Sequence, residues 1–411
     1  MCPPSHQRKC LLSDSKSKMR RPDRRSFLAT SSRAGLGLSL LALHGCSPSE
    51  SVPAGASTNT VDSGLIADLE RLMPQLMATA SVPGLSLVVI RDAQVAWRRG
   101  FGVANAMTGA PVADDTIFEA GSMSKAVFAY VVLKLCETGV LDLDRPLSRY
   151  TDERVITDDA RSDRLTTRHV LSHMSGLPNW RSRSEPMAFA FEPGERWSYS
   201  GEAYSYLQFI VSRLQGRIDP NDCGSYEKDV KVCASDIDSY MRARLLDPFD
   251  MTSGTYVWNE TLQQRGATTH DAKGVLLQRG RASATDAARY GAAGGLFTTP
   301  TDYARFLIEV MAPKPADNWR MTSEHIADML RPVVRVGDVP PHSWALGWQI
   351  LHTPMGDAIA HGGSNPGFQS YAAASVVRRT GMVFMTNGDR GFEIINEIVS
   401  GGTLQRILGQ D

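Results

Sequence analysis

Ser122 and Lys125 are the residues of this chain whose types and spacing best suit covalent chemistry. They stand three positions apart in the sequence Ser-Met-Ser-Lys. On a helix, residues three apart lie on one face, so the amine can reach the hydroxyl. A serine hydroxyl is a poor nucleophile unless a base removes its proton, and a lysine can be that base when burial or neighbouring charge lowers its pKa. The pair therefore predicts acyl transfer through Ser122.

The element that follows Ser122 separates this copy of the motif from the others. The same spacing recurs at residues 13–16, 15–18 and 225–228, where no long apolar helix follows. After Ser122, apolar residues at helical spacing run to residue 137 and Gly139 ends them. A helix N-terminus there would offer exposed N–H groups and positive potential to an oxyanion. The alternative is an ordinary helix cap with a surface lysine.

An ordered set of segments resembles the serine β-lactamase and penicillin-binding-protein family, in its class C-like branch with family VIII esterases and D-aminopeptidases. A single motif could arise by chance, whereas these segments follow the family's order over roughly residues 62–411. They are residues 118–125 (FEAGSMSK), 165–178 (LTTRHVLSHMSGLP), 191–194 with 199–201, 293–297 with 304–307, 345–348 (ALGW) and 361–367 (HGGSNPG).

The resemblance implies a role for each matching residue. Ser122 would be the acylated nucleophile and Lys125 would take or share its proton. Tyr199 would relay a proton to the leaving group, which a phenol with a pKa of about 10 can do only beside cationic groups. The oxyanion hole would consist of the backbone N–H groups of Ser122 and Ser364. His361 would stand where β-lactamases carry the lysine of their K-T-G strand.

Two departures from the family pattern bear on the substrate. Gly201 replaces the asparagine that often follows the tyrosine by two residues, which removes one amide contact. His361-Gly362-Gly363 replaces Lys-Thr-Gly, and a neutral imidazole binds a carboxylate less strongly than an ammonium does; the two glycines would leave room for a substrate along the strand edge. Both changes favour an esterase or a D-amino-acid peptidase or amidase. A true β-lactamase and a non-catalytic binding or sensor protein are the alternatives.

Other residues that could carry chemistry have simpler interpretations. His169 and His173 are four apart but lack the glutamate of H-E-x-x-H, so we expect structural roles and no metal or other cofactor. Glu202 could tune Tyr199 or bind a substrate amine, but a solvated loop charge is expected. Trp180 and Trp344 either line the site or pack in the core. Residues 379–381 (RTG) mimic K-T-G but fit a turn between two strands.

The periodicity of the chain predicts strands near both termini and helices between them. Helices are expected at 64–77, with Pro74 as a kink or early end, at 124–137 and at 392–408. Strands are expected at 85–90, 94–99, 344–351, 358–361, 369–376 and 382–386. We predict an α+β fold of the β-lactamase/transpeptidase type: a mixed, mainly antiparallel sheet from both termini, flanked by helices. Within a hydrolase domain at 63–411, residues about 63–120 and 335–411 would form the sheet and about 121–334 a helical subdomain.

The first 46 residues are typical of an export signal. Arg24-Arg25 begin a twin-arginine pattern, and the apolar run at 34–43 is too short to span a bilayer. Cys46 ends a sequence that resembles a lipobox, so the protein is either tethered to the membrane through lipidated Cys46 or cleaved nearby. Residues 47–62 would be a flexible tether. The expected location is the periplasm or its membrane surface, after twin-arginine export.

The composition limits partners and bonding. The chain has 44 basic and 44 acidic residues, and the leader holds the basic excess, so no basic stripe remains for nucleic acid. The expected partner is a small-molecule ester, amide or D-amino-acid peptide. Cys223 and Cys233 lie in a polar segment and are a candidate disulfide in an oxidising compartment, while Cys136 fits a buried thiol.

Overall fold

The structure is a computed structural model that describes residues 62–181, 185–216, 237–278, 284–338 and 341–409. The export signal, Cys46, the tether up to residue 61, Cys223 and Cys233 lie outside these ranges. The expectations for those segments therefore remain predictions. Cys136 is a free thiol and is half-buried. Burial raises the pKa of this thiol to about 12, which keeps it protonated and unreactive.

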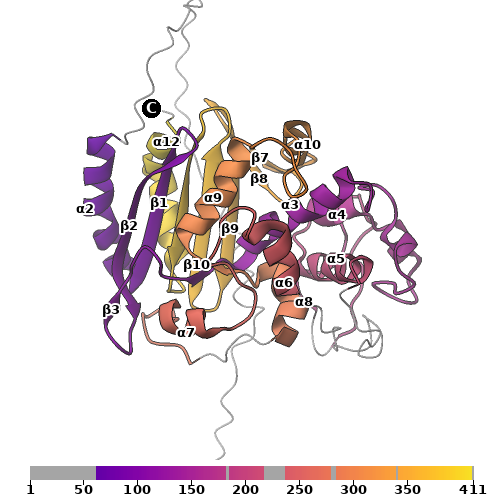
Figure 1. The fold of residues 1–411 in the computed structure, drawn as a ribbon, viewed down its shortest axis with the longest axis horizontal. Helices are drawn as coiled ribbons and strands as arrows, with labels where there is room; N and C mark the ends of the chain where they lie inside the picture. Colours follow the sequence, from indigo (N-terminus) through magenta and orange to yellow (C-terminus); the bar gives the residue numbers. More distant parts are fainter. Residues whose placement is uncertain (1–61, 182–184, 217–236, 279–283, 339–340, 410–411) are drawn as a thin grey trace, which may run out of the picture. The chain divides into compact units, whose positions relative to one another are not determined.

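A nine-stranded sheet joins the two ends of the chain. Its strand order is β3-β2-β1-β11-β10-β9-β8-β7-β6, and neighbouring strands pair antiparallel. Figure 1 shows the indigo strands from the N-terminal part beside the yellow and orange strands from the C-terminal part. The strands are β1 (Gly84–Arg91), β2 (Gln94–Asn105), β3 (Ala110–Pro111), β6 (Val334–Asp338), β7 (Pro341–Trp344), β8 (Gln349–Thr353), β9 (Gly356–Asn365), β10 (Phe368–Ser375) and β11 (Thr380–Thr386). The antiparallel sheet with flanking helices confirms the predicted fold class.

The central strands β1 and β11 are paired with each other and buried. β1 pairs with β11 so that Val88 lies opposite Val383 and Leu87 opposite Phe384. Both strands are buried along nearly their whole length. A strand covered on both faces reads as a continuous apolar run, which is why the sequence 85–90 lacks alternation.

Helices cover both faces of the sheet and form two separate cores. On one face, α2 (Ser63–Ala80), α11 (Gly391–Ser400) and α12 (Thr403–Ile407) pack over β1, β10 and β11. On the other face, α3 (Ser124–Glu137) and α9 (Pro300–Met311) pack with the helical part of the chain. Figure 1 shows α9 in front of the sheet and α2 beside β1 and β2.

The middle of the chain supplies the remaining helices. Figure 1 shows α4, α5, α6 and α8 gathered to one side of the sheet. These elements are α4 (Thr167–Leu171), α5 (Gly201–Leu214), α6 (Ile237–Met241), α7 (Glu260–Arg265), α8 (Ala284–Gly294) and α10 (Ser323–Met329), with shorter helical turns η1 (Gly121–Met123), η2 (Leu147–Arg149), η3 (Ala160–Arg164) and η4 (Arg242–Leu246). A two-stranded sheet pairs β4 (Phe118–Glu119), which lies just before Ser122 in the sequence, with β5 (Phe297–Thr298).

Three expected elements have different bounds in the structure. Pro74 does not end its helix, because α2 continues to Ala80 with its apolar face buried. The strand expected at 344–351 is two strands, β7 and β8, since Gly347 adopts a φ of 89° in the turn between them. The helix expected at 392–408 breaks into α11 and α12 at Gly402, whose φ of 76° is left-handed.

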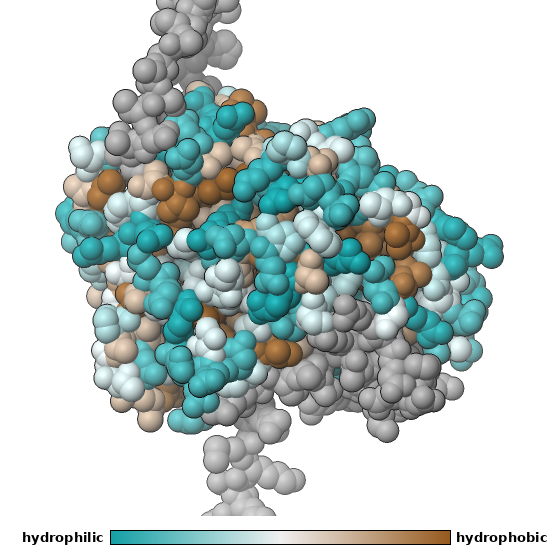
Figure 2. Space-filling view, viewed as in Figure 1, coloured by the Kyte–Doolittle hydropathy of each residue, from teal (hydrophilic) through white to brown (hydrophobic). Residues whose placement is uncertain are grey.

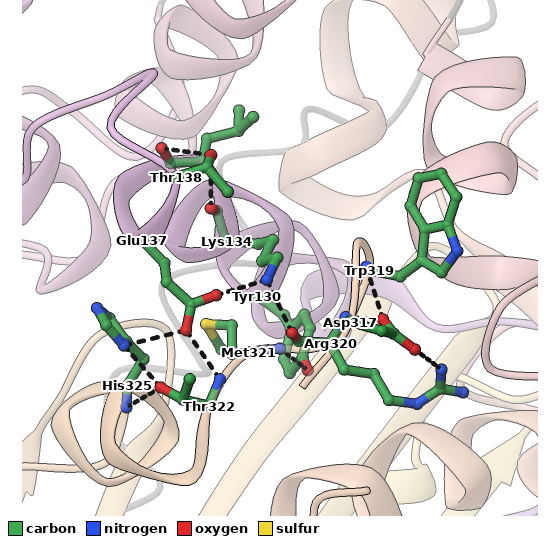
Figure 3. Close-up of polar contacts among 11 residues, drawn as sticks. Tyr130, Lys134, Glu137, Thr138, Asp317, Trp319, Arg320, Met321, Thr322 and His325 are labelled. Atoms are coloured by element: carbon green, nitrogen blue, oxygen red, sulfur yellow. Dashed lines mark hydrogen bonds and ion pairs between the residues drawn. The ribbon is translucent and has the colours of Figure 1, made fainter. Parts of the chain in front are cut away.

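A polar cluster fixes the C-terminal end of α3 to the segment before α10 (Figure 3). The Lys134 amine donates to Glu137 at 2.6 Å and to the Arg320 carbonyl at 2.8 Å. Glu137 also accepts from the Thr322 backbone N–H at 2.8 Å. The helix that begins beside Ser122 is thus held at its far end by charge-assisted hydrogen bonds.

The surface is mostly hydrophilic on the face drawn in Figure 2, with separate small hydrophobic patches. The exposed large hydrophobic residues in the described ranges are far apart in sequence: Met107, Val140, Val275, Met355 and Val377. Each helix in the described part of the chain is too short or too polar to cross a bilayer.

Candidate active site

Ser122 lies in the helical turn η1, immediately before α3. Its side chain is partly exposed, whereas its neighbours Gly121 and Met123 are buried. Ser124 holds the turn in place: its hydroxyl donates to the Gly121 carbonyl at 2.6 Å and accepts from the Leu296 N–H at 3.0 Å. The nucleophile predicted from the sequence is therefore accessible and stands on a rigid helix start.

Lys125 is fully buried, and its amine faces Ser122. The Nζ atom lies 3.2 Å from Ser122 Oγ and 2.5 Å from the carbonyl oxygen of Ala293, near the end of α8. It pairs with no carboxylate in the described part of the chain. Burial lowers the pKa of this amine to about 7, because desolvation disfavours its charged form. A large fraction of the amine is then neutral near pH 7 and can accept a proton.

Tyr199 is the third predicted catalytic residue, and it lies close to the Lys125 amine. Its ring centroid is 4.9 Å from the Lys125 amine. The phenol oxygen is buried and makes no hydrogen bond to any described residue. Burial raises the pKa of Tyr199, and the nearby Ser122 hydroxyl lowers it by less, so the phenol is protonated at neutral pH. The structure thus brings Ser122, Lys125 and Tyr199 together, although they come from η1, α3 and the segment before α5.

His173 contacts Tyr199 directly, which the sequence analysis missed. Its ring centroid is 4.0 Å from that of Tyr199, and its side chain is fully buried. The Nδ1 atom accepts from the Ser200 N–H at 3.1 Å, and its φ of 58° is unusual for a residue other than glycine. Burial, Lys125 and His361 hold the pKa of His173 well below its usual value, so its imidazole is neutral. The structure thus places this histidine against the predicted site.

His361 and Trp344 complete the aromatic surroundings of Tyr199. Trp344 is buried, and its ring lies 5.8 Å from Tyr199 and 5.6 Å from His361. His361 Nδ1 is 2.7 Å from the Gly362 carbonyl oxygen, an arrangement in which Nδ1 carries the proton. Burial lowers the pKa of His361 to about 3, with Lys125 as a further cause. His361 is therefore uncharged and does not present a cation to a substrate.

Strand β9 lies directly against the turn that carries Ser122. A Cβ atom added at Gly363 would lie 1.9 Å from the Ala120 carbonyl oxygen and 3.2 Å from the Ser122 backbone nitrogen. One added at Gly121 would lie 2.7 Å from the Ser364 nitrogen. The Ala120 backbone thus occupies the space beside Gly363. The expectation that a substrate lies along the strand edge at Gly362 and Gly363 remains a prediction. The missing side chains at Gly121 and Gly363 let the backbone amides of Ser122 and Ser364 approach one another.

Asn365 fastens the end of β9 to two other elements. Its Nδ2 atom donates to Glu119 in β4 at 2.6 Å and to the Gly294 carbonyl at the end of α8 at 3.0 Å. The Ser370 hydroxyl in β10 donates to the Glu119 carbonyl at 3.0 Å. The strand, the nucleophile turn and α8 therefore share one hydrogen-bond network around the site.

Glu202 is a buried partner of an ion pair, so the expected solvated loop charge is wrong. Its side chain is 3% exposed, and it accepts from the Arg181 backbone N–H at 2.9 Å and from the Arg181 guanidinium at 2.9 and 3.0 Å. Arg181 lies 21 positions before Glu202 in the sequence, so no local sequence pattern predicts this pair. This pair holds the 179–181 segment against the start of α5.

The two histidines considered for metal binding have other roles. His169 takes part in the capping box of α4 with Thr166, while His173 packs on Tyr199. Within the described ranges, no group of three or more histidine, cysteine or acidic side chains is placed to hold a metal ion. The hydroxyl of Ser122, the amine of Lys125 and the phenol of Tyr199 are groups of this site that can react or transfer protons.

Comparison with known proteins identifies the family. The β-lactamase family model matches residues 69–397, so the chain belongs to the β-lactamase family. It is 29% identical over 186 residues to esterase EstB of Burkholderia gladioli, across 38% of this chain and 47% of EstB. The chain thus spans about half the length of this relative.

Solved structures share the fold. The octameric penicillin-binding-protein homologue of Pyrococcus abyssi has a TM-score of 0.67 at 22% identity, covering 84% of this chain and 78% of that protein. D-alanine carboxypeptidase AmpC of Burkholderia cenocepacia has a TM-score of 0.67 at 20% identity, covering 85% and 99%. Both confirm the β-lactamase/transpeptidase-like fold predicted from the sequence.

Proposed function

We propose that this protein is a serine hydrolase that cleaves small esters or amides through an acyl-enzyme on Ser122. The observation that carries the proposal is the 3.2 Å distance between Ser122 Oγ and the amine of Lys125, a fully buried lysine whose pKa falls to about 7. A neutral amine at this distance can take the serine proton. Esterase and D-alanine carboxypeptidase relatives support a substrate with an ester or amide bond.

The geometry supports a two-step reaction. Lys125 removes the proton of Ser122 Oγ, which forms a bond to the substrate carbonyl carbon, and the Ser122 and Ser364 N–H groups stabilise the oxyanion. As the bond to the leaving group breaks, Tyr199 donates its proton to that group and recovers one from Lys125. Water then attacks the acyl-enzyme, Lys125 accepts the water proton through Tyr199, and Ser122 Oγ leaves reprotonated.

The charge of the site favours esters and simple amides over β-lactams. A β-lactam carries a carboxylate, for which a cation beside the nucleophile is the natural partner. His361 stands at the corresponding position of the third motif, but it is buried and neutral, with a pKa of about 3. We therefore place β-lactam hydrolysis second, and expect slow acylation by such compounds without rapid turnover.

A labelling and hydrolysis experiment tests the proposal. A fluorophosphonate probe should add one label to the wild-type protein, at Ser122, and none to Ser122→Ala. The wild type should hydrolyse p-nitrophenyl acetate, and Ser122→Ala should be at least about 10³-fold slower. Ser323→Ala, which removes an exposed serine hydroxyl in α10, is the matched control for labelling. Absence of Ser122 labelling and turnover in folded protein would support the non-catalytic binder instead.

We also propose that the protein acts outside the cytoplasm. The twin-arginine pattern at residues 24–25 and Cys46 support export and a lipid tether. Cell fractionation of the full chain should place the wild type in the membrane fraction and Cys46→Ala in the soluble periplasmic fraction. Cytoplasmic recovery of both proteins would contradict export, and soluble recovery of both would contradict the tether.

A further inference from the structure

Two separate aromatic groups lie near the Lys125 amine. The first group contains Tyr199, which belongs to the cluster with His173 and Trp344. The second group begins with Trp180, whose ring centroid lies 5.9 Å from the Lys125 amine. Within the described part of the chain, no ring contact joins Trp180 to Tyr199. The Lys125 amine thus lies close to two aromatic groups that share no ring contact with each other.

Trp180 packs against Gly201, the first residue of α5. A Cβ atom added at Gly201 would lie 2.7 and 2.8 Å from carbons of the Trp180 indole. The backbone fixes this position, because the Gly201 N–H donates to both the carbonyl and the side-chain oxygen of Asn179, each at 3.0 Å. The Trp180 ring thus fills the space that a side chain at residue 201 would need.

Tyr290 of α8 extends this surface. Its ring meets Trp180 edge-on, with centroids 5.5 Å apart and planes at 79°, an arrangement that aromatic pairs favour. Arg289 lies over the Tyr290 ring at 4.8 Å. Trp180 and Tyr290 are both half-buried, so part of each residue remains accessible. We call these two residues the aromatic wall.

We propose that the aromatic wall binds the acyl group of the substrate and selects apolar, preferably planar or branched, acyl groups. This inference rests on the proposed function, in which Tyr199 protonates the leaving group. The leaving group then lies on the Tyr199 side of Lys125, and the acyl group lies on the Trp180 side. The indole and phenol rings offer apolar surface there, and its burial favours an apolar acyl group.

A series of p-nitrophenyl esters with a constant leaving group tests the aromatic wall. The ratio of kcat/KM for benzoate to that for acetate is measured in each protein, since comparing ratios between variants cancels the intrinsic reactivity of the two esters. Trp180→Ala should lower this ratio by about 10-fold or more relative to wild type, in the range that loss of apolar contact produces. Trp180→Phe should keep most of the ratio, and Tyr290→Ala should lower it in the same direction.

Matched controls separate specificity from damage to the fold. Trp319→Ala removes another half-buried tryptophan, near the far end of α3 and 5.5 Å from Arg244 (Figure 3), and should leave the ratio unchanged. A ratio within two-fold of wild type in Trp180→Ala, with acetate hydrolysis that still requires Ser122, overturns the aromatic wall but not the hydrolase. Failure of the wild type to hydrolyse any ester in a Ser122-dependent way overturns the proposed function as well.

Discussion

The Lys125 amine determines how activity should depend on pH. As the base, it must be neutral, and its pKa of about 7 predicts that kcat/KM rises with pH through this value and then levels off. Below pH 7, once most of the amine is protonated, kcat/KM should fall about tenfold for each pH unit. Initial rates with a neutral ester between pH 5 and 9 measure this. A profile without a limb in this range would contradict the role of Lys125.

Lys125 also predicts how stability depends on pH. In the unfolded chain the amine holds its proton up to about pH 10.4, whereas in the folded protein it releases it near pH 7. The unfolded state therefore binds more protons between these values, so the lysine's contribution to the free energy of unfolding rises with pH there. Lys125→Met should lose this slope. Urea unfolding of both proteins at pH 7 and 9.5 compares them, and an equal change in both would contradict the prediction.

His173 should position Tyr199 rather than react. His173→Phe keeps a ring against Tyr199 but leaves the buried Ser200 N–H without its acceptor, a loss of about 1–3 kcal/mol in the free energy of unfolding. His173→Asn tolerates the positive φ but loses the ring contact. Because a small displacement of a reacting group is costly, we expect His173→Asn to lower kcat by roughly 10–100-fold, with KM little changed. A kcat equal to that of the wild type in folded His173→Asn would contradict the proposal that His173 positions Tyr199.

At the scale of elements, we expect the contact between β9 and η1 to control the proposed oxyanion site. Gly363→Ala places a Cβ atom 1.9 Å from the Ala120 carbonyl, which must move the strand away from Ser122. The Ser122 and Ser364 amides then separate, and kcat should fall by about 10²–10³-fold. Gly362→Ala is the matched comparison, since the nearest atoms to its Cβ would be side-chain carbons of Phe392 at 3.3 Å and Tyr371 at 3.8 Å. Equal losses in both variants would count against this account.

The polar cluster at the far end of α3 should affect stability and not chemistry. Burial raises the pKa of Glu137, but hydrogen bonds from Lys134 and Thr322 lower it more, so its net shift is downward. Its stabilising contribution is then present above about pH 4.3 and lost as pH falls through the lower folded-state value. Glu137→Gln should cost about 1 kcal/mol at pH 7, and the difference in Tm from wild type should shrink toward pH 3. Thermal unfolding at several pH values checks this.

At the scale of the whole molecule, the sheet separates a supporting core from the site. Leu69 of α2 is fully buried in the core that also contains Phe384 and Ile398, on the face opposite α3. Leu69→Ala should therefore lower the free energy of unfolding by about 2–5 kcal/mol. The kcat of the folded fraction should stay within about two-fold of wild type. Denaturant unfolding with parallel activity assays measures both, and a large drop in kcat of folded protein would contradict this separation.

Some elements could be predicted from short stretches of the sequence alone. The apolar period over residues 124–137 places α3 within its observed bounds, and the apolar run at 85–90 lies within β1. The spacing of Ser122 and Lys125 brings their side chains together, because a helical turn alone sets that distance. These features depend on neighbours in sequence, so patterns and propensities were enough to predict them.

Only the tertiary structure decided the contacts between distant segments. His173 against Tyr199, Glu202 with Arg181, and Gly363 against Ala120 join residues separated by 21 or more positions. The break at Gly347 and the aromatic wall likewise depend on what packs beside them. Such contacts leave no local period, since burial and the reach of a side chain across the fold create them. The sequence thus determined which groups could react, and the packing of separate elements decided which surroundings set their pKa values and face the substrate.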